Sequence, residues 1–188
     1  MFPGSQKERR SSAAGERQGS MLKQQGFSLI ELLIVVGIIL VIAAIAIPNL
    51  MRSRMAANDS SAAASMHAIN VAEAAYFGTY ATFGFPATLA PLGGAQPCTP
   101  GSATACLIDQ SLASGGPKSG YNFAATGSPG PGSPINNQFY ATATPISDQT
   151  GTRAYCSAED LVIRVQPAGN VTLVGSHAAC LALAPLGN

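Results

Sequence analysis

The chain has 188 residues, enough for one modest domain and a membrane anchor. Only 10% of the residues are charged, which is low for a soluble globular protein, and the net charge of +1 argues against a direct nucleic-acid partner. The charge is uneven, because residues 1–26 carry a net +3 and the rest of the chain a net −2. A basic leader before an apolar segment keeps its own side in the cytoplasm, so the chain after residue 50 is expected outside it.

An apolar run follows this leader. Residues 27–47 include only two polar side chains, Ser28 and Glu31. A helix of this length spans roughly 31 Å, the thickness of a bilayer core. A cleavable secretory signal has a shorter apolar core of about 7–15 residues and a small-residue cleavage site after it. The length therefore favours a membrane-spanning segment that is retained.

The start of this run carries a specific motif, Gly26-Phe27-Ser28-Leu29-Ile30-Glu31-Leu32-Leu33. It resembles the processing site of type IV prepilins and pseudopilins, with a glycine, an aromatic residue after it and a glutamate at the fifth position after the cut. The resemblance covers about 30 residues, and Pro48 also falls where that family has a proline.

The resemblance implies that a membrane aspartic peptidase cuts between Gly26 and Phe27. The same enzyme would N-methylate the new amino group of Phe27. Residues 1–26 would then be a cytoplasmic leader that is removed. Because the family's leader is usually short, Met21 is an alternative translation start.

Glu31 places a carboxylate inside this apolar run, where an unpaired charge is costly. Cleavage would place a positive amine on Phe27, and Glu31 of one subunit could pair with the amine of a neighbour in a filament. A low-dielectric core makes such a pair strong and an unpaired charge costly. The alternative is that Glu31 lies at the membrane interface and extends its carboxylate toward water.

The helix is expected to continue beyond the membrane. Residues 27–48 form its membrane or filament-core part, with kinks expected at Gly37 and Pro48, and residues 49–78 its amphipathic part. His67 and Glu73 are expected to be solvated or interfacial rather than catalytic. One face should pack on the globular domain, and its residues recur mostly at helical spacing: Met55, Ala62, Met66, Ile69, Tyr76 and Tyr80.

The remaining chain has the composition of loops and strands. Residues 79–118 are rich in Gly and Pro and predict a connecting loop, with one helical turn near 107–112. Residues 119–188 predict an antiparallel sheet and a disulfide-bounded C-terminal region. The fold class is therefore α+β, pilin-like, with a long N-terminal helix on about four strands. Five segments alternate apolar and polar residues: 120–126, 138–145, 153–156, 161–166 and 170–174, the last two as a hairpin.

Four cysteines lie on the expected exterior side, where disulfides persist. Three pairings are possible, and sequence proximity favours Cys98–Cys106 and Cys156–Cys180. The second pair would resemble the disulfide-bounded C-terminal region of many pilins. A metal site is the alternative, but the spacings are irregular and no C-x-x-C pair occurs, so no metal is expected.

The sequence offers no catalytic pattern, and neither an enzymatic function nor a cofactor is expected. The resemblance implies a structural subunit of a type IV pilus, a helical homopolymer. Such a subunit is stored in the inner membrane with a single span and a periplasmic C-terminal domain, and then reaches the cell surface with the assembly machinery. The alternative is a pseudopilin of a type II secretion system. Major pseudopilins often bind calcium, and the acids available for this are Asp148, Glu159 and Asp160.

Overall fold

The computed structural model describes residues 26–187. The expected leader, apart from Gly26, and the alternative start Met21 lie outside the described residues. The chain divides into two compact units between Ile42 and Ala43, and each is described by itself below. All of the strands lie in the second unit.

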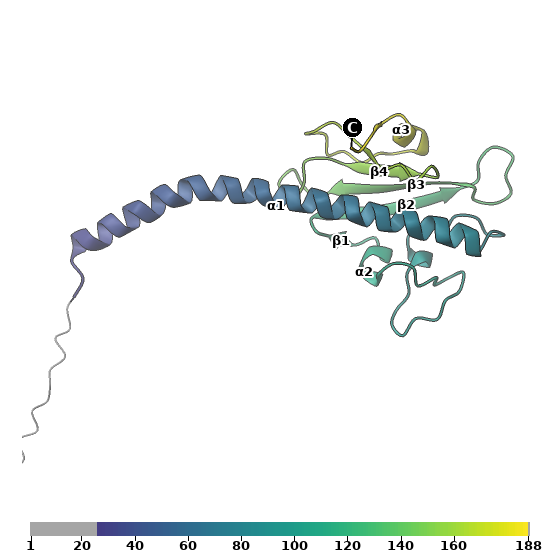
Figure 1. Ribbon diagram of the computed structural model, residues 1–188, viewed down its shortest axis with the longest axis horizontal. Helices are drawn as coiled ribbons and strands as arrows, with labels where there is room; N and C mark the ends of the chain where they lie inside the picture. The colour runs from purple at the N-terminus through teal and green to yellow at the C-terminus, as the bar shows by residue number, and fades with distance from the viewer. Residues whose placement is uncertain (1–25, 188) are drawn as a thin grey trace, which may run out of the picture. The chain divides into compact units, whose positions relative to one another are not determined.

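One long helix, α1, runs from Leu29 to Thr79 and includes Pro48 in its interior (Figure 1). Proline removes one backbone hydrogen bond from a helix, yet the 51 residues of α1 form one uninterrupted element. The helix ends next to Gly78, and its last turn is closed by a bond from the Tyr80 amide to the Tyr76 carbonyl (2.8 Å). The long N-terminal helix predicted from the sequence is confirmed.

Within the second unit, α1 buries one face. Ala62, Met66, Ile69 and Tyr76 are buried, as their spacing predicts, whereas Met55 is only partly covered. These positions recur every three, four or seven residues, so they fall on one stripe of the helix. The prediction for Glu73 was wrong: this residue lies on the same stripe and is fully buried.

The strands form one antiparallel sheet of six strands in sequential order (Figure 1). The α+β fold class is confirmed, but the expected number of about four strands was too low. The additional strands are two-residue segments at the edges, too short to produce an alternating pattern. The strands are β1 (Pro117–Lys118), β2 (Tyr121–Ser128), β3 (Gln138–Pro145), β4 (Tyr155–Ala158), β5 (Arg164–Val165) and β6 (Ala184–Pro185).

The expected hairpin of 161–166 with 170–174 is not formed. A turn does occur, with the Asn170 amide donating to the Pro167 carbonyl (3.0 Å). The residues on either side of it bond to the start of β4 instead, because Ala154 accepts from Gln166 (2.9 Å) and donates to Asn170 (3.4 Å). The open edge of β5 pairs with β6, so residues 170–174 have no strand to join.

The sheet and α1 enclose the main hydrophobic core. In β2 the buried residues alternate, as Tyr121, Phe123 and Ala125. In the register of β2 with β3, Phe123 lies opposite Ala143 and Ala125 opposite Ala141. The Phe123 ring thus faces a small side chain across the strands, which lets the layer fill its volume without overcrowding.

Polar side chains of α1 bond to strand β2 and to the segments before and after β4. The Asp59 carboxylate accepts from the Tyr121 hydroxyl (2.5 Å) and from the Thr152 amide (3.0 Å). Charge-assisted bonds of this kind are stronger than neutral ones and fix the helix against the strands. Two asparagines of α1 add bonds to backbone carbonyls: Asn58 to Thr150 (2.8 Å) and Asn70 to Leu161 (2.9 Å).

Three short helical segments complete the fold, and two disulfides tie it together. The segments are η1 (Ala90–Leu92), α2 (Gln110–Ala113) and α3 (His177–Leu181). Asp109 caps α2 by accepting from the Leu112 amide, which is why this helix begins three residues later than the turn predicted at 107–112. The disulfides join Cys98 to Cys106 within the connecting loop and Cys156 of β4 to Cys180 of α3.

Candidate functional site

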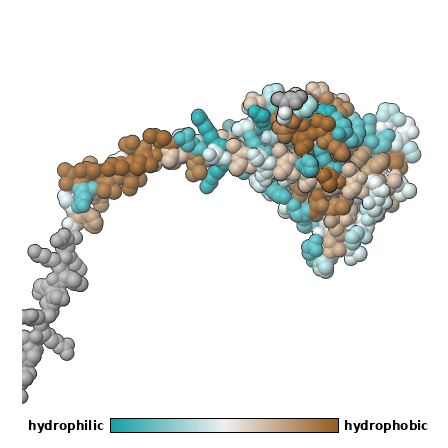
Figure 2. Space-filling view, in the orientation of Figure 1, coloured by the Kyte–Doolittle hydropathy of each residue, from teal (hydrophilic) through white to brown (hydrophobic). Residues whose placement is uncertain are grey.

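The apolar half of α1 is the most unusual surface of the molecule. Every residue from Gly26 to Ile42 is exposed, although almost all of them are large and apolar (Figure 2). By length and composition α1 can cross a membrane. A soluble monomer rarely exposes a contiguous apolar surface of this extent, so the segment requires a lipid or protein environment.

Phe27 and Glu31 lie together at the start of this surface. Residues 26–28 are not helical, and the first helical turn is closed by the Leu32 amide donating to the Ser28 carbonyl (3.2 Å). Phe27 is 83% exposed. Glu31 and Val35 are four residues apart and share one side of the helix, and Phe27, just before the helix, lines the same hollow.

These residues line a groove of about 350 Å³, which Leu32 and Val36 complete. Glu31 is the one ionisable side chain of the lining, and among residues 26–187 no cation forms an ion pair with it. An apolar groove with a single carboxylate can hold a cation with an apolar side chain, because the carboxylate pairs with the charge and the walls cover the side chain.

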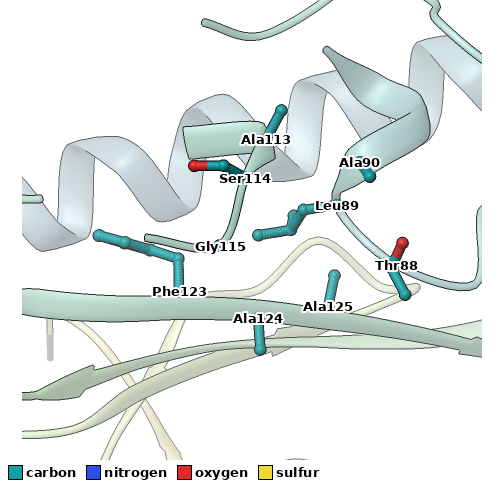
Figure 3. A pocket seen from close by; sticks show the side chains of 9 residues that line it. All are labelled: Thr88, Leu89, Ala90, Ala113, Ser114, Gly115, Phe123, Ala124 and Ala125. Carbon is teal, nitrogen blue, oxygen red and sulfur yellow. The ribbon is translucent and has the colours of Figure 1, made fainter. Parts of the chain in front are cut away.

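A second hollow lies on the folded unit, between η1, α2 and β2 (Figure 3). It measures about 230 Å³, and Leu89, Ala113 and Phe123 supply much of its lining. None of its lining residues carries an ionisable group, and Thr88 and Ser114 are the side chains with a hydroxyl. This lining offers no acid, base or activated nucleophile for a reaction.

The two histidines described by the structure do not combine with a nucleophile. His67 is exposed on α1. His177 lies 2.6 Å from a carboxylate oxygen of Glu159, an ion pair when the ring is protonated. Within residues 26–187 no three His, Cys, Asp or Glu side chains are grouped so as to hold a metal ion.

Two of the three acids that could serve a calcium site are in ion pairs. Asp160 pairs with Arg164 (2.5 Å), which lowers the pKa of its carboxyl, and Glu159 pairs with His177. Asp148 is exposed and belongs to the loop after β3. All four cysteines are in disulfides, so none is available as a thiolate ligand.

The sequence analysis placed one ionisable residue wrongly, because Glu73 was expected to be solvated or interfacial and is fully buried. Neither of its carboxylate oxygens has a hydrogen-bond partner within the described residues. Burial raises the pKa of this carboxyl from 4.5 to about 8, so it is mostly protonated at neutral pH. Its spacing from Met66 and Ile69, seven and four residues, could have placed it on the buried face.

Comparison with known proteins bears on the segment around Phe27 and Glu31. Residues 21–47 match the family described as "Prokaryotic N-terminal methylation motif". Over 40 residues the chain is 55% identical to the "Type IV wide pilus major component PilA4" of Thermus thermophilus. Residues 21–47 of this chain are therefore similar to the amino-terminal segment of a type IV pilus component.

The pilin match is confined to this segment. It covers 21% of this chain, and the chain spans 30% of the length of the relative it matches. No solved structure matches the chain. The architecture of the globular unit is therefore described from this structure alone. It is a helix packed on an antiparallel sheet, with two disulfides.

Proposed function

We propose that this chain is a subunit of a type IV pilus. The observation that carries the proposal is the conjunction of the methylation motif at 21–47 with a helix whose apolar half is exposed along its whole length. The similarity to a major pilus component points the same way.

In this proposal the chain has the parts expected from its sequence. A prepilin peptidase removes residues 1–26 and methylates Phe27, and residues 27–48 anchor the subunit in the inner membrane. The helical part 49–78, the loop 79–118 and the sheet region 119–188 are then exposed in the periplasm. The pilus assembly machinery transfers the subunit into a homopolymer that reaches the cell surface. The subunit is structural and has no catalytic role.

Assembly depends on the groove around Glu31. After cleavage, Phe27 bears both a positive amine and an aromatic side chain, the combination that this groove can hold. Docking of a neighbour's Phe27 would bring the amine to Glu31 while the ring covers the apolar walls. Because each charge is costly in an apolar core without the other, the pair would fix the axial position of each subunit.

N-terminal analysis of the mature protein tests the processing step. Mass spectrometry should find a chain that begins with N-methylated Phe27, and any other first residue would refute the proposed cut. Replacement of Glu31 by Ala tests assembly. Filaments should be lost while processing continues, and assembly at normal yield would contradict the pairing.

A pseudopilin of a type II secretion system carries the same motif, and gene deletion separates the two functions. Loss of surface fibres with secretion intact supports the pilus subunit. Loss of protein secretion with fibres intact would favour the pseudopilin.

A further inference from the structure

Most lysines and arginines of the folded unit have no ion-pair partner within the described residues. Residues 26–187 contain five lysines and arginines, and two of them are in ion pairs, Lys118 with Asp109 (2.9 Å) and Arg164 with Asp160 (2.5 Å). The other three, Arg52, Arg54 and Arg153, are exposed and form no ion pair within the described residues.

Arg52 and Arg54 follow the apolar part of α1, and Arg153 lies beside the next turn of the same helix. Arg52 directly follows Leu50 and Met51, two exposed apolar residues. Along α1, Figure 2 shows a hydrophilic stretch that succeeds the apolar one. Arg153, although distant in the sequence, lines a groove of about 320 Å³ together with Ala56 and Ser60 of α1. Arg52 lies one turn before Ala56, on the same side of the helix.

Asp59 also lines this groove, but its carboxylate is already engaged. It accepts hydrogen bonds from Tyr121 and from both the amide and the hydroxyl of Thr152. Its charge is thus directed toward donors of the folded unit, and Arg153 is left without an ion-pair partner. Asp148, an exposed acid five residues before Arg153, forms no ion pair with any of the three arginines.

We propose that Arg52, Arg54 and Arg153 bind anionic phospholipid headgroups at the membrane surface, Arg52 and Arg153 on one side of α1 and Arg54 on the opposite side. The inference rests on the proposed storage of the subunit in a membrane. Arg52 is four residues, or about 6 Å, beyond the end of the proposed membrane-spanning part at residue 48. The headgroup layer is about 5–7 Å thick on each side of the hydrocarbon core, so Arg52 would lie within it. Ala56, beside Arg153, is four residues and about 6 Å further along the helix. The flexible side chain of Arg153 can reach back over this distance.

The chemistry of the three side chains suits a phosphodiester. A guanidinium offers two parallel N–H donors that match two phosphate oxygens, and it is charged at every physiological pH. Arginines at this depth would hold the subunit at a fixed height in the bilayer before assembly. Each basic residue near an anionic surface contributes about 1 kcal/mol, or roughly a fivefold preference.

The test uses the full mature chain in vesicles of phosphatidylcholine with a minor fraction of phosphatidylglycerol. Electron paramagnetic resonance of spin-labelled phosphatidylglycerol and phosphatidylcholine measures how much of each lipid the protein immobilises. The wild type should prefer phosphatidylglycerol severalfold, and the preference should fall at high salt. The triple variant R52Q/R54Q/R153Q should show no preference, whereas the matched control Lys118→Gln should retain it.

The single variant Arg153→Gln tests whether a residue outside α1 contributes to lipid binding, or whether Arg52 and Arg54 of α1 suffice. It should lower the preference by up to about fivefold, and an unchanged preference would overturn the site as proposed. Equal immobilisation of both lipids by the wild type would overturn it as well. So would a triple variant that keeps the lipid preference but fails to form filaments, since the arginines would then serve an acidic face of another copy. Failure of the wild type to enter the bilayer, seen as extraction by alkaline carbonate, would instead refute the proposed membrane storage.

Discussion

Replacement of Glu73 by Gln should stabilise the folded unit at neutral pH. Glu73 is fully buried in α1, and neither carboxylate oxygen has a partner within the described residues. Burial raises the pKa of the carboxyl from 4.5 to about 8. Glutamine has nearly the same shape and is also polar, with an amide nitrogen in place of one oxygen, but it does not ionise, so the pH dependence of the difference reports the cost of ionisation.

The sign follows from proton binding. Between pH 4.5 and about 8 the folded chain keeps a proton that the unfolded chain releases, so the stability of the wild type falls as the pH rises through this window. The loss is about 1.4 kcal/mol for each pH unit above 4.5, or about 3 kcal/mol at pH 7. For a chain of this size, that corresponds to roughly 6–12 °C in Tm.

Thermal unfolding of the full chain in detergent, followed by near-UV circular dichroism at pH 5, 6, 7 and 8, measures this effect. The wild type should lose stability across the series. Glu73→Gln should be nearly independent of pH, close to the wild type at pH 5 and clearly above it at pH 7. The exposed acid Asp148 provides the control, because Asp148→Asn should follow the wild type. A wild-type Tm that stays constant from pH 5 to 8 would refute the reasoning.

Three further substitutions test the packing of the folded unit, each by urea unfolding of the full chain in detergent. Replacement of Cys156 and Cys180 by Ser opens a loop closed across 24 positions and should cost about 3 kcal/mol; an unchanged midpoint in oxidising buffer would contradict a role of this disulfide in stability. Asp59→Asn should cost about 1.5–3 kcal/mol, because the carboxylate receives bonds from Tyr121 and Thr152, and Asp148→Asn is the matched exposed control. Met66→Ala should cost about 2–5 kcal/mol, since Met66 is fully buried in the core, whereas Met51→Ala, at an exposed position, should change the midpoint little.

The long helix and the central strands could be read from the sequence because their patterns are extended. Apolar residues at helical spacing over 49–78 and alternation over 138–145 each repeat several times, and both elements are present in the structure. The two edge strands could not be found in this way. β1 and β6 have two residues each, and their pairing is decided by which neighbouring edge is free rather than by their own composition. The inner strand β5, also two residues long, falls within the predicted segment 161–166.

The error over residues 170–174 has the same origin. The segment Asn170–Val174 alternates apolar and polar residues, as a strand would, but a strand forms only if an edge is available. Here Ala154 bonds to Gln166 and Asn170, and β6 takes the edge of β5. A local sequence pattern does not show which distant segments compete for the same backbone partners, and for this reason it predicted a strand at 170–174 that does not form.

Glu31 and Glu73 are both carboxyl groups in apolar surroundings on one helix. The way in which each can be neutralised depends on its surroundings. Glu73 is enclosed by its own fold, where no cation within the described residues reaches it, so protonation is the way for this carboxyl to remain buried near neutral pH. Glu31 lies on an exposed apolar surface, beside Phe27, and its groove is open to a second molecule. A carboxylate at such a position can be neutralised from outside, which makes it useful for assembly in a way that an enclosed carboxyl is not. The distinction predicts opposite responses to the same change: removal of the charge at residue 73 should strengthen the folded unit, whereas removal of the charge at residue 31 should leave the folded unit unchanged and abolish the filament.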